Sequence, residues 1–200
     1  MAERLDTRID GPILVQPRVF RDERGFFHES YRREEWAQLG VEQEFLQENH
    51  SRSRRGVVRG MHFQYRGGPR DNGMSKLVRC SAGAILDVVV DLRRGSPSFG
   101  EWEAFELDDE TLRQLLCPVG FAHGFCVLSE FADVAYRCDA YHDPASEGGI
   151  AYDDPDLAIT WPEGLELVVS ARDAQAPRLR EVADDLPFLY TTSPPGEFRS

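Results

Sequence analysis

The chain has 200 residues, of which 41% are hydrophobic, and a formal net charge of −12. This length predicts one domain, residues 1–200, and the acidic balance argues against nucleic acids and anionic membranes as partners. The longest apolar runs are too short to span a bilayer, and charges alternate over the first ten residues, where a signal peptide needs an apolar stretch. We therefore expect a cytoplasmic protein.

Apolar and polar residues alternate with a period of two along much of the chain, which is typical of strands. In chain order we expect a short helix at 33–39, strands at 57–64, 76–80 and 85–93, a helical turn at 108–112, a strand at 133–141, a helix at 174–185 and a frayed end at 193–200. Glycine, proline and asparagine turn signals separate these segments. Many short strands with such punctuation predict an all-β fold, a jelly-roll or cupin-like barrel with a few short peripheral helices.

His62 lies in the strand predicted at 57–64. Alternation places it on one face with Val58, Gly60 and Gln64. A glycine inside a strand indicates that another group approaches the backbone closely. Spacing alone favours a hydrogen-bonded core histidine over a catalytic one.

His123 stands between Gly120 and Gly124, among aromatic residues. Two glycines around a histidine predict a tight bend that holds the imidazole in place. The alternative is a structural histidine that caps the turn. The other three histidines fit surface or packing positions.

Metal and nucleophile signatures are missing from the sequence. No His-x-His, Cys-x-x-Cys or Gly-x-Ser-x-Gly motif occurs, and no glycine-rich loop opens a helix. The four cysteines lie in apolar or alternating runs and are expected to be buried and reduced. These observations leave acid–base chemistry, and a metal site only if distant residues assemble it.

The basic residues are unevenly distributed. Four arginines, Arg52, Arg54, Arg55 and Arg59, lie within eight residues with no acid between them. They fit a solvated turn and an anion site equally well. Lys76 is the single lysine among 23 lysines and arginines. Its survival hints at a position that needs a compact ammonium group.

Eight segments, taken in order, resemble the family of dTDP-4-dehydrorhamnose 3,5-epimerases, cupin-fold epimerases of nucleotide-linked keto sugars. They include Val58-Arg59-Gly60-Met61-His62-Phe63-Gln64 and Ser170-Ala171-Arg172-Asp173. The others are 20–30, 47–51, 76–80, 87–100, 118–125 and 154–162. The similarity implies a core at about 11–177 and a C-terminal tail at 178–200.

The resemblance implies a dTDP-linked 4-keto-6-deoxyhexose as substrate, inverted at C3 and C5 through an enolate, with no cofactor and no metal. His62 matches the family's base, and Asp173 matches the carboxylate that orients it. Tyr136 matches the acid on the opposite face. Lys76 matches the cation near the developing oxyanion, which would explain why this one position is a lysine.

The resemblance also implies substrate contacts and a homodimer. His123 matches a second pocket histidine, and Arg59 looks like a pyrophosphate contact. The other matched substrate contacts are Phe20, Arg24 and Glu29, on an N-terminal strand that reaches into the partner's site, together with Gln47, Asn49 and Tyr141.

Two departures from the family pattern leave alternatives open. The connection at 65–73 looks longer than usual, and His142 stands where family members often have a second tyrosine. A one-centre epimerase or keto-isomerase of the same family remains an alternative. So do a metal-dependent cupin oxygenase and a sugar-nucleotide binding module without catalysis.

Overall fold

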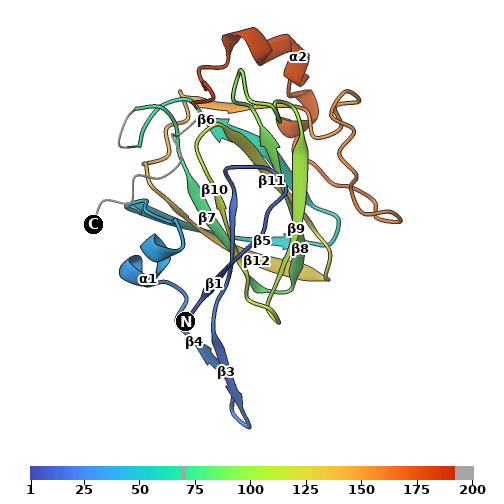
Figure 1. Cartoon of the computed structure of the whole chain (residues 1–200). Coiled ribbons are helices and arrows are strands. Elements are labelled where there is room, and N and C mark those ends of the chain that lie inside the picture. Colours follow the sequence, from blue (N-terminus) through green and yellow to red (C-terminus); the bar gives the residue numbers. More distant parts are fainter. Residues whose placement is uncertain (69–70, 192–200) are drawn as a thin grey trace, which may run out of the picture.

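The structure is a computed structural model that describes residues 1–68 and 71–191, so the frayed end expected at 193–200 lies outside the described residues. Two antiparallel sheets form the body (Figure 1). The first has the order β1 (Glu3–Leu5), β2 (Ile13–Gln16), β10 (Gln114–Cys117), β7 (Lys76–Ala82), β12 (Phe131–Cys138) and β5 (Gln47–Arg54). The second has the order β13 (Glu147–Gly149), β6 (Val58–Gln64), β11 (Phe121–Val127), β8 (Ala84–Asp91) and β9 (Trp102–Asp108). The predicted all-β, jelly-roll or cupin-like class is confirmed.

The main core lies between the two sheets. Val78, Leu115 and Val134 of the first sheet pack there with Val89 and Phe125 of the second. All five are at most 4% exposed, so the cluster forms a closely buried apolar core between the sheets. Burial of alternate residues from both sheets explains the period of two in the sequence.

Strand β8 is buried on both faces. Val88 and Val90 belong to a second cluster on the outer side of their sheet, whereas Val89 belongs to the core between the sheets. Asp87 shares the inner side with Val89 and is completely buried. A carboxylate in this position needs a polar partner, and His123 provides it, as described below.

The C-terminal segment covers the outer side of the second sheet. The single helix expected at 174–185 is wrong, because the structure has three short pieces: η1 (Asp173–Gln175), α2 (Leu179–Val182) and η2 (Ala183–Asp185). Pro177 lies between the first two pieces and disfavours helical geometry in the residue before it. The segment nevertheless stays packed on the sheet, because Leu179, Leu186 and Phe188 belong to the outer cluster.

The two other helical predictions had different outcomes. The helix expected at 33–39 is confirmed as α1 (Arg33–Gln38), whose Trp36 packs on Val15 and Leu116 of the first sheet. The helical turn expected at 108–112 is a single hydrogen-bonded turn, in which the N–H of Leu112 donates to the carbonyl of Asp108 at 3.1 Å. The Asp108 carboxylate caps it by accepting the backbone N–H groups of Glu110 and Thr111, and Leu112, with φ +58°, ends it before a second turn forms.

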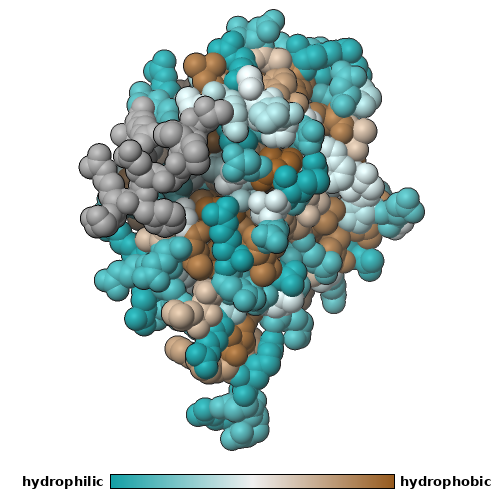
Figure 2. All heavy atoms as spheres, in the orientation of Figure 1, coloured by the Kyte–Doolittle hydropathy of each residue, from teal (hydrophilic) through white to brown (hydrophobic). Residues whose placement is uncertain are grey.

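A hairpin of β3 (Val19–Asp22) and β4 (Gly25–His28) projects from the body (Figure 1). Its far end is hydrophilic in Figure 2. Phe20, Phe26 and Phe27 are 51%, 49% and 70% exposed, which is unusual for three aromatic residues so close together. Within the described ranges, no helix is long and apolar enough to cross a membrane.

Candidate active site

A cavity of about 530 Å³ opens between β6, β7, β11, β12 and the C-terminal segment. Its wall combines apolar side chains with several titratable ones. The titratable and basic residues that line it are Arg59, His62, Lys76, His123, Tyr136, Glu147, Arg172 and Asp173. Six elements, β6, β7, β11, β12, β13 and η1, therefore place acid–base groups around one space.

His62 and Asp173 form the central pair of the cavity. Nε2 of His62 lies 2.7 Å from Oδ1 of Asp173, and the two side chains are 25% and 6% exposed. Burial lowers the pKa of His62 below its usual 6.5, with Lys76 acting in the same direction, and the Asp173 carboxylate opposes the shift. The imidazole is therefore neutral at pH 7. Because Nε2–H donates to Asp173, the lone pair that can accept a proton is on Nδ1.

Asp173 reaches His62 because the C-terminal segment runs beside β6. Val168 exchanges two backbone hydrogen bonds with the start of β6: its carbonyl accepts from Val58 at 2.9 Å, and its N–H donates to Gly56 at 2.9 Å. The segment then turns, and the N–H of Asp173 donates to Oγ of Ser170 at 3.1 Å. These backbone contacts fix the carboxylate at the cavity wall.

Tyr136 and Lys76 enter the cavity from the first sheet. Burial raises the pKa of Tyr136 above 10, which keeps its hydroxyl protonated at neutral pH. Its register partner on β5 is Asn49, whose side-chain hydrogen bond to Tyr136 opposes this shift. Lys76 begins β7 and pairs with Cys117 of β10 and Cys138 of β12. The cavity thus holds a neutral base, a protonated phenol and an ammonium group.

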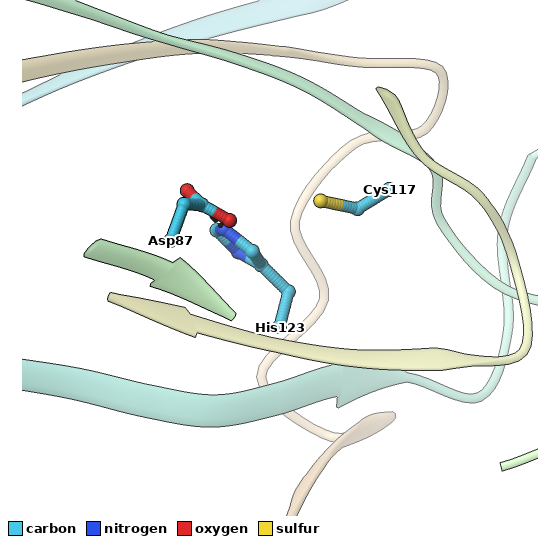
Figure 3. A group of neighbouring side chains, drawn as sticks. All are labelled: Asp87, Cys117 and His123. Atoms are coloured by element: carbon cyan, nitrogen blue, oxygen red, sulfur yellow. Dashed lines mark hydrogen bonds and ion pairs between the residues drawn. The ribbon is translucent and has the colours of Figure 1, made fainter. Parts of the chain in front are cut away.

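His123 forms a second pair with Asp87. Its Nε2 lies 2.9 Å from Oδ2 of Asp87, and Cys117 of β10 points its sulfur toward the pair (Figure 3). The predicted tight bend at His123 is wrong, because the residue lies within β11. Gly120 precedes the strand with φ +89°, and Gly124 has a packing role instead.

Gly60 and Gly124 allow β6 and β11 to approach each other closely. A Cβ on Gly60 would lie 2.5 Å from Cα of Gly124, and the φ of Gly60 is +149°. The predicted close approach at Gly60 is confirmed. The register between the two strands also shifts between His123 and Phe125. This irregularity lets Arg59 line the same cavity as His62, although strict alternation would separate them.

The basic cluster does not act as one site. Arg52 forms two hydrogen bonds to Asp133, of 2.7 and 2.6 Å, on the outer part of the barrel. Arg54 and Arg55 are exposed. Only Arg59 reaches the cavity, where its Nε donates to Oγ of Ser53 at 2.9 Å.

Six of the expected substrate contacts are not among the described residues that line this cavity. Phe20 and Arg24 are on the projecting hairpin and Glu29 follows it; Arg24 pairs with Asp22 and Glu29 with Arg32. The other three are Gln47, Asn49 and Tyr141; Tyr141 is 69% exposed. The Gln47 amide donates to Asn49 at 2.9 Å, so these two side chains act together beside Tyr136.

Two charged residues of the cavity wall were not singled out from the sequence. Glu147 of β13 accepts a hydrogen bond from Nη1 of Arg172 at 2.6 Å, and both line the cavity. Arg172 directly precedes Asp173, which the resemblance had selected, so its position in the sequence could have identified it as a site residue. Glu147 had only the turn signal of Gly148 and Gly149 beside it. Asp87 had no signal beyond its place in an alternating strand. The four cysteines are free and buried, as expected.

Comparison with known proteins gives one consistent result. The profile of the family described as dTDP-4-dehydrorhamnose 3,5-epimerase matches residues 6–181. A dTDP-4-dehydrorhamnose 3,5-epimerase of Salmonella typhimurium is 46% identical over 176 residues, which cover 88% of this chain and 94% of the relative.

Two solved structures extend the comparison to the fold. A dTDP-6-deoxy-D-glucose-3,5-epimerase of Legionella pneumophila, in complex with dTDP-4-keto-L-rhamnose, superposes with a TM-score of 0.90 at 42% identity, covering 96% of this chain and all of that one. A 3'-monoepimerase of Streptomyces bikiniensis in complex with dTDP-quinovose gives a TM-score of 0.82 at 36% identity, covering 92% and 90%. With the family profile spanning most of its length, this chain belongs to the dTDP-4-dehydrorhamnose 3,5-epimerase family of isomerases.

Proposed function

We propose that the chain inverts C3 and C5 of a dTDP-linked 4-keto-6-deoxyhexose, with its own side chains as acid and base. The observation that carries this proposal is the His62–Asp173 pair, in one cavity with Tyr136 and Lys76. The solved relative from Legionella pneumophila binds dTDP-4-keto-L-rhamnose, which supports the substrate class.

The chemistry follows from the groups in the cavity. Nδ1 of neutral His62 takes the proton from a carbon next to the C4 ketone, and Asp173 stabilises the imidazolium that forms. The electron pair moves onto the ketone oxygen, where the Lys76 ammonium stabilises the enolate. The Tyr136 hydroxyl then protonates the carbon from the opposite face, which inverts the centre. Solvent returns the proton to Tyr136 and removes the one on His62.

The nucleotide part of the substrate carries the charge that the cavity cations match. Arg59 and Arg172 line the wall, and the guanidinium fork suits the oxygens of a pyrophosphate. In a chain of net charge −12, these arginines and Lys76 make a local basic site for an anionic ligand. The proposed steps use protein side chains and solvent, and no metal or cofactor.

We also propose a cytoplasmic homodimer. Four buried free cysteines suit a reducing compartment. Phe20, Arg24 and Glu29 lie on or just after the hairpin that projects from the body (Figure 1). This hairpin, which the structure describes in full, contributes no residue to the lining of its own cavity. In a homodimer this hairpin reaches the partner's cavity and supplies the missing contacts there, while Gln47, Asn49 and Tyr141 contact the nucleotide or sugar at the rim.

Incubation with dTDP-4-keto-6-deoxyglucose in deuterium oxide tests the function directly. The expected result is deuterium at both C3 and C5 of an inverted product. The similarity to a 3'-monoepimerase keeps one-centre action as the second candidate, and label at a single carbon would establish it. No label at either carbon would contradict both candidates and favour a binding module.

A further inference from the structure

Asp87, Cys117 and His123 form a compact buried group behind the cavity wall. They come from β8, β10 and β11, and their ligand atoms all lie within 4.8 Å of one another. The residues are 0%, 2% and 7% exposed. Figure 3 shows the Cys117 sulfur directed toward the His123–Asp87 pair.

This group has bonding capacity that the described part of the chain does not use. Oδ2 of Asp87 is bonded to His123, but Oδ1 is buried without a hydrogen-bond partner among the described residues. A buried carboxylate oxygen left in this way is destabilising and calls for an explanation. A bound cation would provide one.

We propose that Asp87, Cys117 and His123 bind a thiophilic divalent cation, of which Zn²⁺ is the best chemical match. Thiolate sulfur, imidazole nitrogen and carboxylate oxygen are the ligands that Zn²⁺ takes, and a hard cation such as Mg²⁺ avoids sulfur. Zn–N bonds of about 2.0 Å and Zn–S bonds of about 2.3 Å require the ligand atoms to draw together by on the order of 1 Å.

Charge and protons balance when the cation binds. The carboxylate and a Cys117 thiolate together neutralise the charge of the cation, and the thiol proton leaves to solvent. His123 stays neutral, because its proton moves from Nε2 to Nδ1 as Nε2 takes up the metal. Burial raises the pKa of the Cys117 thiol well above its usual range, and Asp87 acts in the same direction, so the thiol gives up its proton only when the cation takes the sulfur. Lys76 opposes this shift, but its own positive charge repels a bound cation.

Occupation of this site would affect the cavity. His123 lines both the cavity and the metal site, so a bound cation occupies its Nε2 and removes that nitrogen as a hydrogen-bonding group for a substrate. Zn²⁺ is therefore an inhibitor, competitive with the sugar nucleotide, rather than an activator. Only this inhibition rests on the proposed function; binding of the cation does not.

Cobalt(II) titration of the purified chain tests the site without turnover, because a Co²⁺–thiolate bond gives a charge-transfer absorption. One Co²⁺ per chain is expected, with this absorption, displaced by Zn²⁺ but not by Mg²⁺. Cys117→Ala should abolish the absorption and weaken binding at least about tenfold. The matched control is Cys80→Ala, which removes another buried cysteine of the same core and should leave both unchanged.

Two results would overturn the proposal: wild-type protein that gives no thiolate absorption with Co²⁺, or Cys117→Ala protein that binds Co²⁺ as tightly as the wild type. Circular dichroism establishes that the variants fold. Asp87→Asn keeps the size of the side chain and should weaken Co²⁺ binding at least about tenfold, so the site stays testable if Cys117→Ala does not fold. Unchanged Co²⁺ affinity in Asp87→Asn would show that the Asp87 carboxylate is not a ligand of the cation.

Discussion

His62 of β6 and His123 of β11 are register partners, and each imidazole is hydrogen-bonded to a different aspartate. Both rings line one cavity, but the His62 side chain is 25% exposed and that of His123 only 8%. Asp173 reaches His62 from the C-terminal segment, whereas Asp87 lies on the strand next to His123. The two pairs are thus chemically alike and differ in access, which supports the more open His62 as the proposed proton acceptor.

Replacement of His62 by alanine removes the proposed base for both carbons. We expect solvent exchange and inversion to fall together by about 10²–10⁴-fold, the usual contribution of a general base. Deuterium incorporation followed by mass spectrometry measures both. His50→Ala, at an exposed histidine of β5 outside the cavity, is the control. Exchange that persists at one carbon at the wild-type rate would reveal a second base.

Replacement of Tyr136 by phenylalanine removes one hydroxyl and keeps the ring. Proton removal by His62 should continue, whereas inversion should fall by about 10²–10⁴-fold because the acid on the opposite face is gone. The measurement compares label uptake with product configuration. Tyr152→Phe, outside the cavity lining, should change neither. Equal loss of uptake and inversion would count against Tyr136 as the acid.

The pH dependence follows from the two shifted groups. The base works when neutral, so kcat/KM should rise as the pH increases through the lowered pKa of His62 and stay flat at neutral pH. It should fall only above the ordinary Tyr pKa of 10, because burial raises that of Tyr136. Asp173→Asn removes the carboxylate that opposes the shift of His62. The acidic limb should therefore move to lower pH, while the plateau also falls.

An exposed aspartate gives the control for this pH profile. Asp156→Asn lies outside the cavity lining and should leave both limbs in place. If the acidic limb of Asp173→Asn coincided with that of the wild type, the limb would belong to a group other than His62.

Replacement of Gly60 by alanine should destabilise the junction of β6 and β11. The new Cβ would lie 2.5 Å from Cα of Gly124, a backbone atom that cannot move aside. We expect a loss of about 1–3 kcal/mol in the free energy of unfolding, measured by urea denaturation. Gly95→Ala is matched in having a positive φ, +84°, but has nothing within 4 Å, so it reports the backbone effect alone. Equal losses in the two variants would contradict the close approach as the cause.

Mixed dimers test whether the projecting hairpin serves a partner's site. Arg24→Ala and His62→Ala protomers should each be inactive alone. In an equal mixture that exchanges subunits, roughly a quarter of the sites combine an intact His62 with an intact partner hairpin, so activity should return to that level. A mixture that stays inactive after confirmed exchange would show that Arg24 acts within its own chain, and an Arg24→Ala protein that is active alone would show that Arg24 is dispensable.

Much of the architecture was predictable because alternation is a local property. The strands around His62, Lys76 and Tyr136 follow directly from residues that alternate along the chain. The helix expected at 174–185 failed because a proline inside an otherwise suitable segment outweighs the propensity of its neighbours. The bend expected at His123 failed because Gly124 serves packing between strands, a non-local reason that spacing does not reveal.

The candidate site was predictable only in part. The resemblance selected Asp173, and the structure places it 2.7 Å from His62. Arg172 and Glu147 escaped notice because their ion pair joins the C-terminal segment to β13, and these two parts of the chain approach each other only after folding. Asp87 escaped notice for a related reason. Alternation shows which residues of a strand share a side, but it does not show that both sides of β8 are buried, so the burial of Asp87 could not be predicted.

The contact between His62 and Asp173 joins residues 111 positions apart. A ribosome adds about 5–20 residues per second, so a nascent chain carries His62 for on the order of ten seconds before Asp173 exists. During that time the imidazole has no carboxylate to set its tautomer. The order of synthesis thus leaves the proposed base without its carboxylate until the last part of the cavity wall is made. A chain truncated before Val168 would retain every described strand of both sheets but would lack Asp173, so this carboxylate could not orient His62.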